Sequence, residues 1–208
     1  IAVAEKSNLF NAPETYMDKI SANVNEKNVV DLDFTLKKNI FNLADYKNKD
    51  PKNLTVCLLD RPRHKKIIDE LNNIGVKLKL ITDGDVSGAL LVSDNKHKVD
   101  LFLGEGGGPE GVLAAAALDA FDCFFQGRFL FKTDIDKKRA KSMGINDFQK
   151  KYNLDEIVSG DSIFCATGIT SGDLVSGIKI DSNIFFSETL ITHKSSGLKK
   201  IIKKHEKI

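Results

Sequence analysis

The chain has 208 residues, a length that allows one or two domains with a sizeable core. Its 31 Lys and Arg and 29 Asp and Glu residues leave a net charge of +2, which gives no general reason to expect a nucleic-acid or membrane partner. No apolar run approaches the roughly 18 residues of a membrane span, and the cysteines form no CxxC or Cys/His cluster. We therefore expect a cytoplasmic protein without a cysteine-based metal site.

Within the first 50 residues, the segment 21–50 is polar and carries few periodic apolar positions. These 50 residues predict the end of a strand at 1–5, a turn at 11–15 that enters a short helix holding Tyr16 and Met17, and a connector over 21–50 with one helix near 39–46. The polar connector gives way to an apolar run after residues 47–52, and this change in composition predicts a domain boundary there.

Three strand–loop–helix units follow this boundary. The predicted strands are 54–59, 76–81 and 99–103, and the predicted helices are 65–74, a short one after Asp85, and an alanine-rich one at about 110–121. Alternation of this kind favours neighbouring, mostly parallel strands whose loops project from one edge of the sheet.

The last third of the chain is less regular. We expect residues 126–128 to end the alanine-rich helix, 132–151 to hold a solvated helix, 154–157 and 161–167 to lead into a turn at 168–173, 183–190 to form a strand, and 199–208 to form a basic, solvated terminal helix. A terminal contact with an anion or a membrane is the less favoured alternative.

The first loop, Arg61-Pro62-Arg63, carries two arginines around a proline that fixes the backbone. Guanidinium groups match phosphate oxygens in a two-pronged arrangement that lysine cannot reproduce. The simpler alternative is a pair of surface arginines after a strand.

The second loop, Asp83-Gly84-Asp85, ends a strand, so its carboxylates can converge on one point. They could accept hydrogen bonds from sugar hydroxyls or bind Mg²⁺ or Mn²⁺. The alternative is a turn in which Asp85 caps the next helix.

The third loop, 104–111, is rich in glycine and precedes a helix, whose N-terminus favours anions. It is not a Walker A loop, and Pro109 breaks the dinucleotide fingerprint. Glu110 would repel a phosphate unless a cation lay between them, so it is a candidate metal ligand. Compensation of the helix dipole is the alternative for Glu110.

The sequence resembles the class II, bacterial-type fructose-1,6-bisphosphatase family. The matching motifs keep the family's order over nearly the whole chain: NAPETYMDK (11–19), RPRH (61–64), DGDV (83–86), GEGGGPEGVLAAAAL (104–118), GRF (127–129), AKSMGI (140–145), CATGITSGDL (165–174) and SETL (187–190). The resemblance implies the layered α/β sugar-phosphatase fold, shared with inositol monophosphatases, with mixed sheets flanked by helices.

The resemblance also implies roles for particular residues. Those expected to contact the substrate are Tyr16, Arg61, Pro62, Arg63, Asp83, Gly84, Asp85 and Gly107, whereas Glu110 is expected to bind the metal. The family's acidic DPIEGT motif has no counterpart here. We therefore expect the catalytic residues upstream of Ile1, the chain to be the C-terminal two-thirds of such an enzyme, and residues 1–50 to complete an N-terminal domain before a substrate-binding domain at 51–208.

The activity implied is hydrolysis of the 1-phosphate of fructose 1,6-bisphosphate, with Mn²⁺ or Mg²⁺, in gluconeogenesis. A homo-oligomer is expected, and the chain alone is expected to be inactive. One alternative is an enzyme that also accepts sedoheptulose 1,7-bisphosphate. The other is a non-catalytic module that binds phosphosugars, which the absence of the acidic motif would permit.

Overall fold

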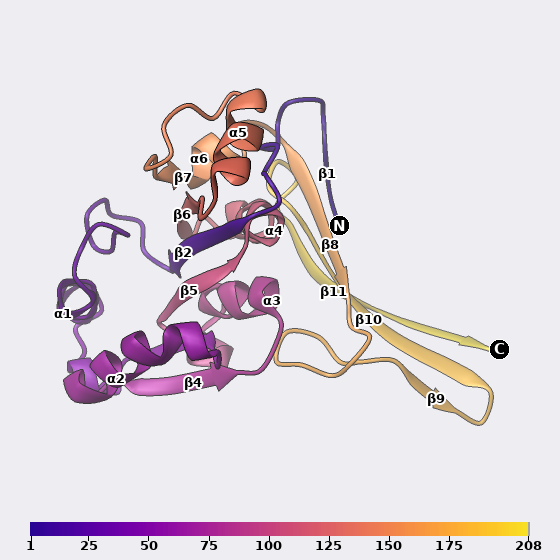
Figure 1. Ribbon diagram of the computed structural model, residues 1–208. Helices are drawn as coiled ribbons and strands as arrows, with labels where there is room; N and C mark the ends of the chain where they lie inside the picture. Colours follow the sequence, from indigo (N-terminus) through magenta and orange to yellow (C-terminus); the bar gives the residue numbers. More distant parts are fainter. Residues whose placement is uncertain (208) are drawn as a thin grey trace.

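A computed structural model describes residues 1–207 as two β-sheets with helices between and beside them (Figure 1). The larger sheet has six strands, in the spatial order β4 (Lys77–Ile81), β3 (Thr55–Leu59), β5 (Leu101–Gly107), β2 (Tyr16–Ala22), β6 (Phe124–Leu130) and β7 (Tyr152–Asn153). β3 runs parallel to both β4 and β5, as the three strand–loop–helix units predict. The other strand pairs of this sheet are antiparallel.

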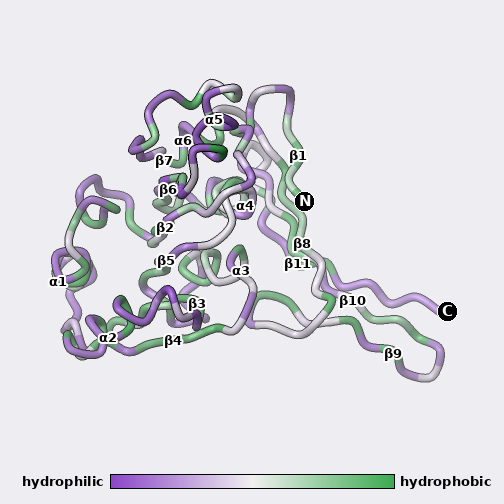
Figure 2. The backbone as a smooth tube through the Cα atoms, viewed as in Figure 1, coloured by the Kyte–Doolittle hydropathy of each residue, from purple (hydrophilic) through white to green (hydrophobic). Residues whose placement is uncertain are grey.

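The second sheet is antiparallel throughout. Its strands are β1 (Ala2–Ala4), β8 (Ser162–Thr167), β10 (Ile184–His193) and β11 (Leu198–Lys207), with β9 (Lys179–Asp181) paired to part of β10. β10 and β11 run on beyond β8 as an arm, on which β9 pairs with β10 (Figure 1). Most of β11 is hydrophilic (Figure 2), consistent with the exposure of its side chains.

The helices form two layers around the larger sheet. α1 (Leu36–Tyr46) and α2 (Lys65–Ile74) pack on one face, whereas α3 (Asp85–Leu90) and α4 (Gly108–Asp119) lie on the other face, toward the second sheet (Figure 1). The remaining helices are α5 (Asp134–Ser142), α6 (Leu154–Ile157) and the 3₁₀ turns η1 (Pro51–Asn53), η2 (Pro62–His64), η3 (Leu91–Ser93) and η4 (Asn95–His97). The predicted layered α/β fold, with mixed sheets flanked by helices, is confirmed.

α4 is apolar around most of its circumference because it is enclosed by both sheets. Small side chains, among them the run 114–117, let it approach β2, β5 and β8 closely. A separate apolar cluster on the far side of the six-stranded sheet joins α1 and α2 to β2, β3 and β5. The predicted helices near 39–46 and at 65–74 supply this cluster, and Gly75 ends α2 in the left-handed conformation at φ 87°.

Several predictions of local structure are wrong. Tyr16 and Met17 begin β2 rather than a helix, residues 126–128 lie inside β6, and the described part of the basic tail is β11. The glycine segment is also shorter than predicted, because Gly104 to Gly107 continue β5 and α4 begins at Gly108. In each case hydrogen-bonded pairing with a neighbouring strand outweighs the local pattern.

Residues 1–50 contribute to both sheets, since β1 pairs with β8 and β2 pairs with β5 and β6. The predicted boundary near residues 47–52 therefore does not coincide with a break between the sheets. As a statement about domains of a longer protein, it stays a prediction.

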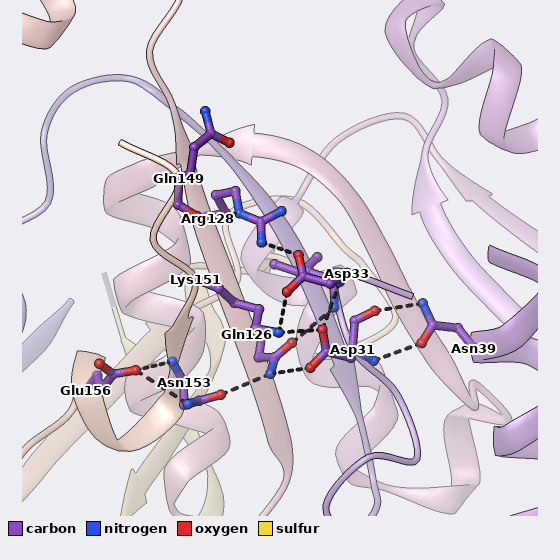
Figure 3. Close-up of polar contacts among 10 residues, drawn as sticks. Asp31, Asp33, Asn39, Gln126, Arg128, Gln149, Lys151, Asn153 and Glu156 are labelled. Atoms are coloured by element: carbon purple, nitrogen blue, oxygen red, sulfur yellow. Dashed lines mark hydrogen bonds and ion pairs between the residues drawn. The ribbon is translucent and has the colours of Figure 1, made fainter. Parts of the chain in front are cut away.

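A polar network fastens the connector to β6 (Figure 3). Lys151 pairs with both Asp31 and Asp33, and Arg128 pairs with Asp33 while donating to the backbone carbonyl of Gln149. Buried Gln126 accepts a hydrogen bond from the Leu32 amide at 3.1 Å and donates to Asp31. The partners of Arg128, in the GRF motif, are therefore residues that hold the fold together.

No helix within residues 1–207 is both long and apolar enough to cross a membrane.

Candidate functional site

The pairing of β2 with β5 places Tyr16 opposite Gly107, at the start of α4. Arg63, in η2 after β3, lies with its guanidinium carbon 5.0 Å from the centre of the Tyr16 ring. Its Nε and Nη2 both donate to the backbone carbonyl of Glu105, at 3.1 and 2.8 Å. The structure thus brings together three of the predicted substrate-binding residues from three separate elements.

An open cavity of about 700 Å³ lies beside this arrangement. Three predicted residues line it: Tyr16, Gly107 and the exposed Glu110. The remaining lining residues are Glu14, Thr15, Pro109, Lys132 and Asp136. A cavity of this size holds a small phosphorylated sugar.

Asp85 is fixed by a buried lysine that the sequence did not single out. The ammonium group of Lys19, in β2, pairs with Asp85 Oδ2 and donates to the carbonyl of Gly107 at 2.9 Å. Burial lowers the pKa of Lys19, and the attraction of Asp85 only partly opposes this effect. The other carboxylate oxygen, Oδ1, is buried and has no hydrogen-bond partner among the described residues.

Two glycines make room for the carboxylates. A Cβ on Gly106 would lie 2.2 Å from Asp85 Oδ2, and a Cβ on Gly107 would lie 1.9 Å from Glu110 Oε2. At Gly106 the carboxylate cannot move away, because Asp85 is held by Lys19, so glycine is required there for close approach rather than for a positive φ. At Gly107 the exposed, flexible Glu110 side chain could move aside to admit a Cβ.

His64, beside the two arginines, has a structural role. It is buried, its Nδ1 lies 2.7 Å from the carbonyl of Leu59, and the Glu105 amide donates to its Nε2 at 2.8 Å. Both contacts are satisfied when Nδ1 carries the proton and Nε2 does not. His64 thereby links β3 to β5 and holds the Glu105 backbone that receives Arg63.

The other predicted residues are not among those that line the cavity. The Arg61 side chain donates a 3.4 Å hydrogen bond to the Asp60 carbonyl, and Pro62 is exposed. Asp83 is exposed and accepts from the amide of Gly84 at 2.8 Å, whereas Gly84 adopts φ 89° before α3. Asp83 and Asp85 therefore do not converge on one partner, and Asp85 does not cap α3, because its carboxylate turns to Lys19. The assignment of these residues to the substrate stays a prediction.

The described residues do not by themselves fit a metal centre. Glu110 is exposed and can supply a carboxylate, but residues 1–207 contain no group of three or more His, Cys, Asp or Glu side chains placed to hold an ion. A hard cation such as Mg²⁺ takes six oxygen ligands. Glu110 can therefore be at most one ligand of a larger site.

Sequence reasoning missed Lys19 and Lys132. A lysine in a strand that also holds Met17 and Ile20 is a signal for a buried charge, but Lys19 follows a segment predicted as a helix. Lys132 follows β6 and lies with its Nζ 5.2 Å from the centre of the Tyr16 ring. Nothing in the sequence distinguishes it from the chain's many other surface lysines.

Comparison with known proteins gives the same family over almost the entire chain. Residues 1–206 match the family described as bacterial fructose-1,6-bisphosphatase, glpX-encoded. A protein of Synechococcus sp. (strain JA-3-3Ab), named D-fructose 1,6-bisphosphatase class 2/sedoheptulose 1,7-bisphosphatase, is 35% identical over 94% of this chain and 60% of its own length. A protein of Haemophilus influenzae, named fructose-1,6-bisphosphatase class 2, is 37% identical over 97% of this chain and 65% of its own length.

The chain thus spans about 60–65% of the length of these relatives. The match nonetheless covers both sheets and every element that contributes to the cavity. The chain belongs to the bacterial, glpX-encoded fructose-1,6-bisphosphatase family.

Proposed function

We propose that these residues form the phosphosugar-binding part of an enzyme that hydrolyses the 1-phosphate of fructose 1,6-bisphosphate to fructose 6-phosphate. The observation that carries this proposal is the convergence of Tyr16, Gly107 and Glu110 on one open cavity, with Arg63 against the Tyr16 ring. Cationic and aromatic groups suit a phosphate and a sugar, and a carboxylate suits a cation.

In this proposal the substrate-contacting residues are Tyr16, the segment Arg61-Pro62-Arg63, the segment Asp83-Gly84-Asp85, and Gly107. Glu110 contributes one ligand to a Mg²⁺ or Mn²⁺ site. The other ligands and the groups that activate water lie outside these residues, since one carboxylate does not hold a catalytic cation. The metal, when bound, would stabilise charge on the phosphate that reacts.

Three further points belong to the same proposal. The enzyme works in the cytoplasm in gluconeogenesis, it forms a homo-oligomer, and its chain divides near residue 50 into an N-terminal domain and a substrate-binding domain at 51–208. The small net charge of +2 supports a small-molecule substrate rather than a nucleic acid.

Two other functions have some support. Activity toward sedoheptulose 1,7-bisphosphate is favoured by the name of the Synechococcus relative and by the openness of a cavity of about 700 Å³. A non-catalytic phosphosugar-binding module is favoured by the single candidate metal ligand among residues 1–207.

Two measurements test the proposal. Calorimetric titration of the 208-residue chain with fructose 1,6-bisphosphate should show binding, whereas fructose should not bind. Phosphate release by the complete gene product, with Mn²⁺ or Mg²⁺, should occur with fructose 1,6-bisphosphate and leave fructose 6-phosphate. Binding without any phosphate release would favour the non-catalytic module, and absence of both would contradict the proposal.

A further inference from the structure

Two cationic side chains lie close to the ring of Tyr16. The guanidinium carbon of Arg63 is 5.0 Å from the ring centre, and the ammonium nitrogen of Lys132 is 5.2 Å from it. They come from opposite sides of β2 in the sheet, because Arg63 follows β3 and Lys132 follows β6. Like charges gathered at one aromatic ring form a favourable place for an anion.

Glu105 contacts both of these cations. Its backbone carbonyl accepts both hydrogen bonds of Arg63, and its carboxylate lies 4.0 Å from the Lys132 ammonium. The Lys132 side chain is 64% exposed, so this ion pair is long, hydrated and worth little. A phosphate dianion, with more charge and more acceptor oxygens, can therefore replace the Glu105 carboxylate as the partner of Lys132.

The position of Lys132 relative to the cavity gives it access to a ligand. Lys132 is the sole cationic side chain that lines the 700 Å³ cavity within the described residues, where it faces the same space as Tyr16 and Glu110. Arg63 and Lys132 lie at Tyr16, and Glu110 lies in the first turn of α4. One phosphate can thus be held at the ring while the other points toward the metal site to which we assign Glu110, with the cation between the phosphate and the carboxylate.

We propose that Lys132 is a further substrate-binding residue, which forms with Arg63 and Tyr16 a clamp for the phosphate that is not hydrolysed. This inference rests on the proposed function and names a residue of the same site. Its specific consequence is that Lys132 distinguishes sugars that carry the distal 6-phosphate from sugars that do not.

The test is calorimetric titration of the 208-residue chain with fructose 1,6-bisphosphate, fructose 6-phosphate and fructose 1-phosphate. Lys132→Met should weaken binding of the first two about fivefold, the size expected for one partly exposed charge contact, and should leave fructose 1-phosphate unchanged. Lys132→Arg should retain most of the affinity. Glu105→Gln should act in the opposite direction and tighten the first two about threefold, because it removes the competing carboxylate.

Lys137→Met is the matched control. Lys137 lies in α5, pairs with Asp134 at 3.8 Å, and is not among the residues that line the cavity, so its removal should change none of the three affinities. If the unmodified chain binds none of the three sugars, both the proposed function and this inference fail. If the unmodified chain binds them but Lys132→Met has no effect, or weakens all three equally, the role of Lys132 alone is overturned. Weaker binding by Glu105→Gln would also overturn it.

Discussion

The ion pair between Lys19 and Asp85 is the most consequential buried interaction at the site. Lys19 is 1% exposed and the Asp85 side chain 12% exposed. Replacing Lys19 by Met keeps the length of the side chain but removes its charge. Asp85 Oδ2 then joins Oδ1 in having no partner, and the Gly107 carbonyl loses its donor. The change therefore leaves an uncompensated carboxylate inside the protein.

Breaking a buried ion pair by removing one partner costs about 3–5 kcal/mol of the free energy of unfolding. For a chain of this size each kcal/mol lowers the melting temperature by about 2–4 °C, so we expect a decrease of about 6–20 °C. Urea unfolding and thermal unfolding should agree on the size of the effect.

An exposed ion pair supplies the control. Lys79 pairs with Asp173 at 2.9 Å, with side chains 30% and 49% exposed, so Lys79→Met should cost less than about 1 kcal/mol. The double variant Lys19→Met/Asp85→Leu should recover most of the stability lost in Lys19→Met, because it removes the stranded charge as well. A loss for Lys19→Met no larger than that for Lys79→Met would refute the reasoning.

Three further predictions concern binding, metal and acid. Arg63→Ala should weaken fructose 1,6-bisphosphate binding by about 2 kcal/mol, or about thirtyfold, as measured by calorimetry, and unchanged affinity would contradict its role. Glu110→Gln should raise the Mn²⁺ concentration needed for half-maximal activity of the complete enzyme, whereas a carboxylate that only compensates the α4 dipole would change stability by about 0.3–1 kcal/mol and leave metal dependence alone. Asp31 and Asp33 should stabilise the fold above the unfolded pKa of about 3.9 and lose this contribution as pH falls through their lowered folded pKa values. For Asp31, burial opposes the lowering of the pKa but the hydrogen bond from Lys151 and its other contacts outweigh it, and for Asp33 the hydrogen bonds from Lys151 and Arg128 lower the pKa. Lys151→Met should therefore destabilise the protein more at pH 7 than at pH 2, and an equal loss in urea unfolding at both pH values would exclude this linkage.

The part of the fold that the sequence predicts well is the run of strand–loop–helix units. β3 and β4 are apolar or alternating segments, each followed by loop residues and a helix, so their parallel pairing follows from local pattern and general topology. α2 is equally clear, because its apolar residues recur at helical spacing and Gly75 ends it. Here local and tertiary preferences agree.

β2 could not be predicted in this way because its stability comes from two neighbouring strands. Its sequence, YMDKISA, has a charged residue at the centre, and that charge is tolerated only because Asp85 and Gly107 meet it. β11 is the opposite case, since its paired lysines and isoleucines, in the sequence LKKIIKKHEK, resemble a weakly amphipathic helix. Ten residue pairs with β10 hold it as a strand.

Residue types suggest which side chains could form the candidate site, but the sequence does not predict how these side chains are arranged. Arg63 and Glu110 follow from charge and position in a loop, but the contact of Arg63 with Tyr16 needs β2 to lie beside β5. The sequence also does not show that glycines of these motifs are needed for close packing. A Cβ on Gly111 or on Gly127 would lie 2.4 or 2.5 Å from the sulfur of Met17, so residues from three separate motifs form one packed unit.

β2, which the sequence pattern does not predict as a strand, is thus the element that positions the residues of the candidate site. Side chains alternate along β2, so Met17 and Lys19 share one face, and Tyr16 and Asp18 share the other. Met17 and Lys19 both approach Gly111 of α4, which places the Asp85 ion pair in the protein interior. Tyr16, at the end of the strand, instead borders the cavity with Arg63 and Lys132 close to its ring. One short strand therefore holds a buried charge that fixes Asp85 and presents an exposed ring beside which Arg63 and Lys132 lie. The motif at 11–19 and the glycine segment at 104–111 therefore form the candidate site together, through the pairing of β2 with β5.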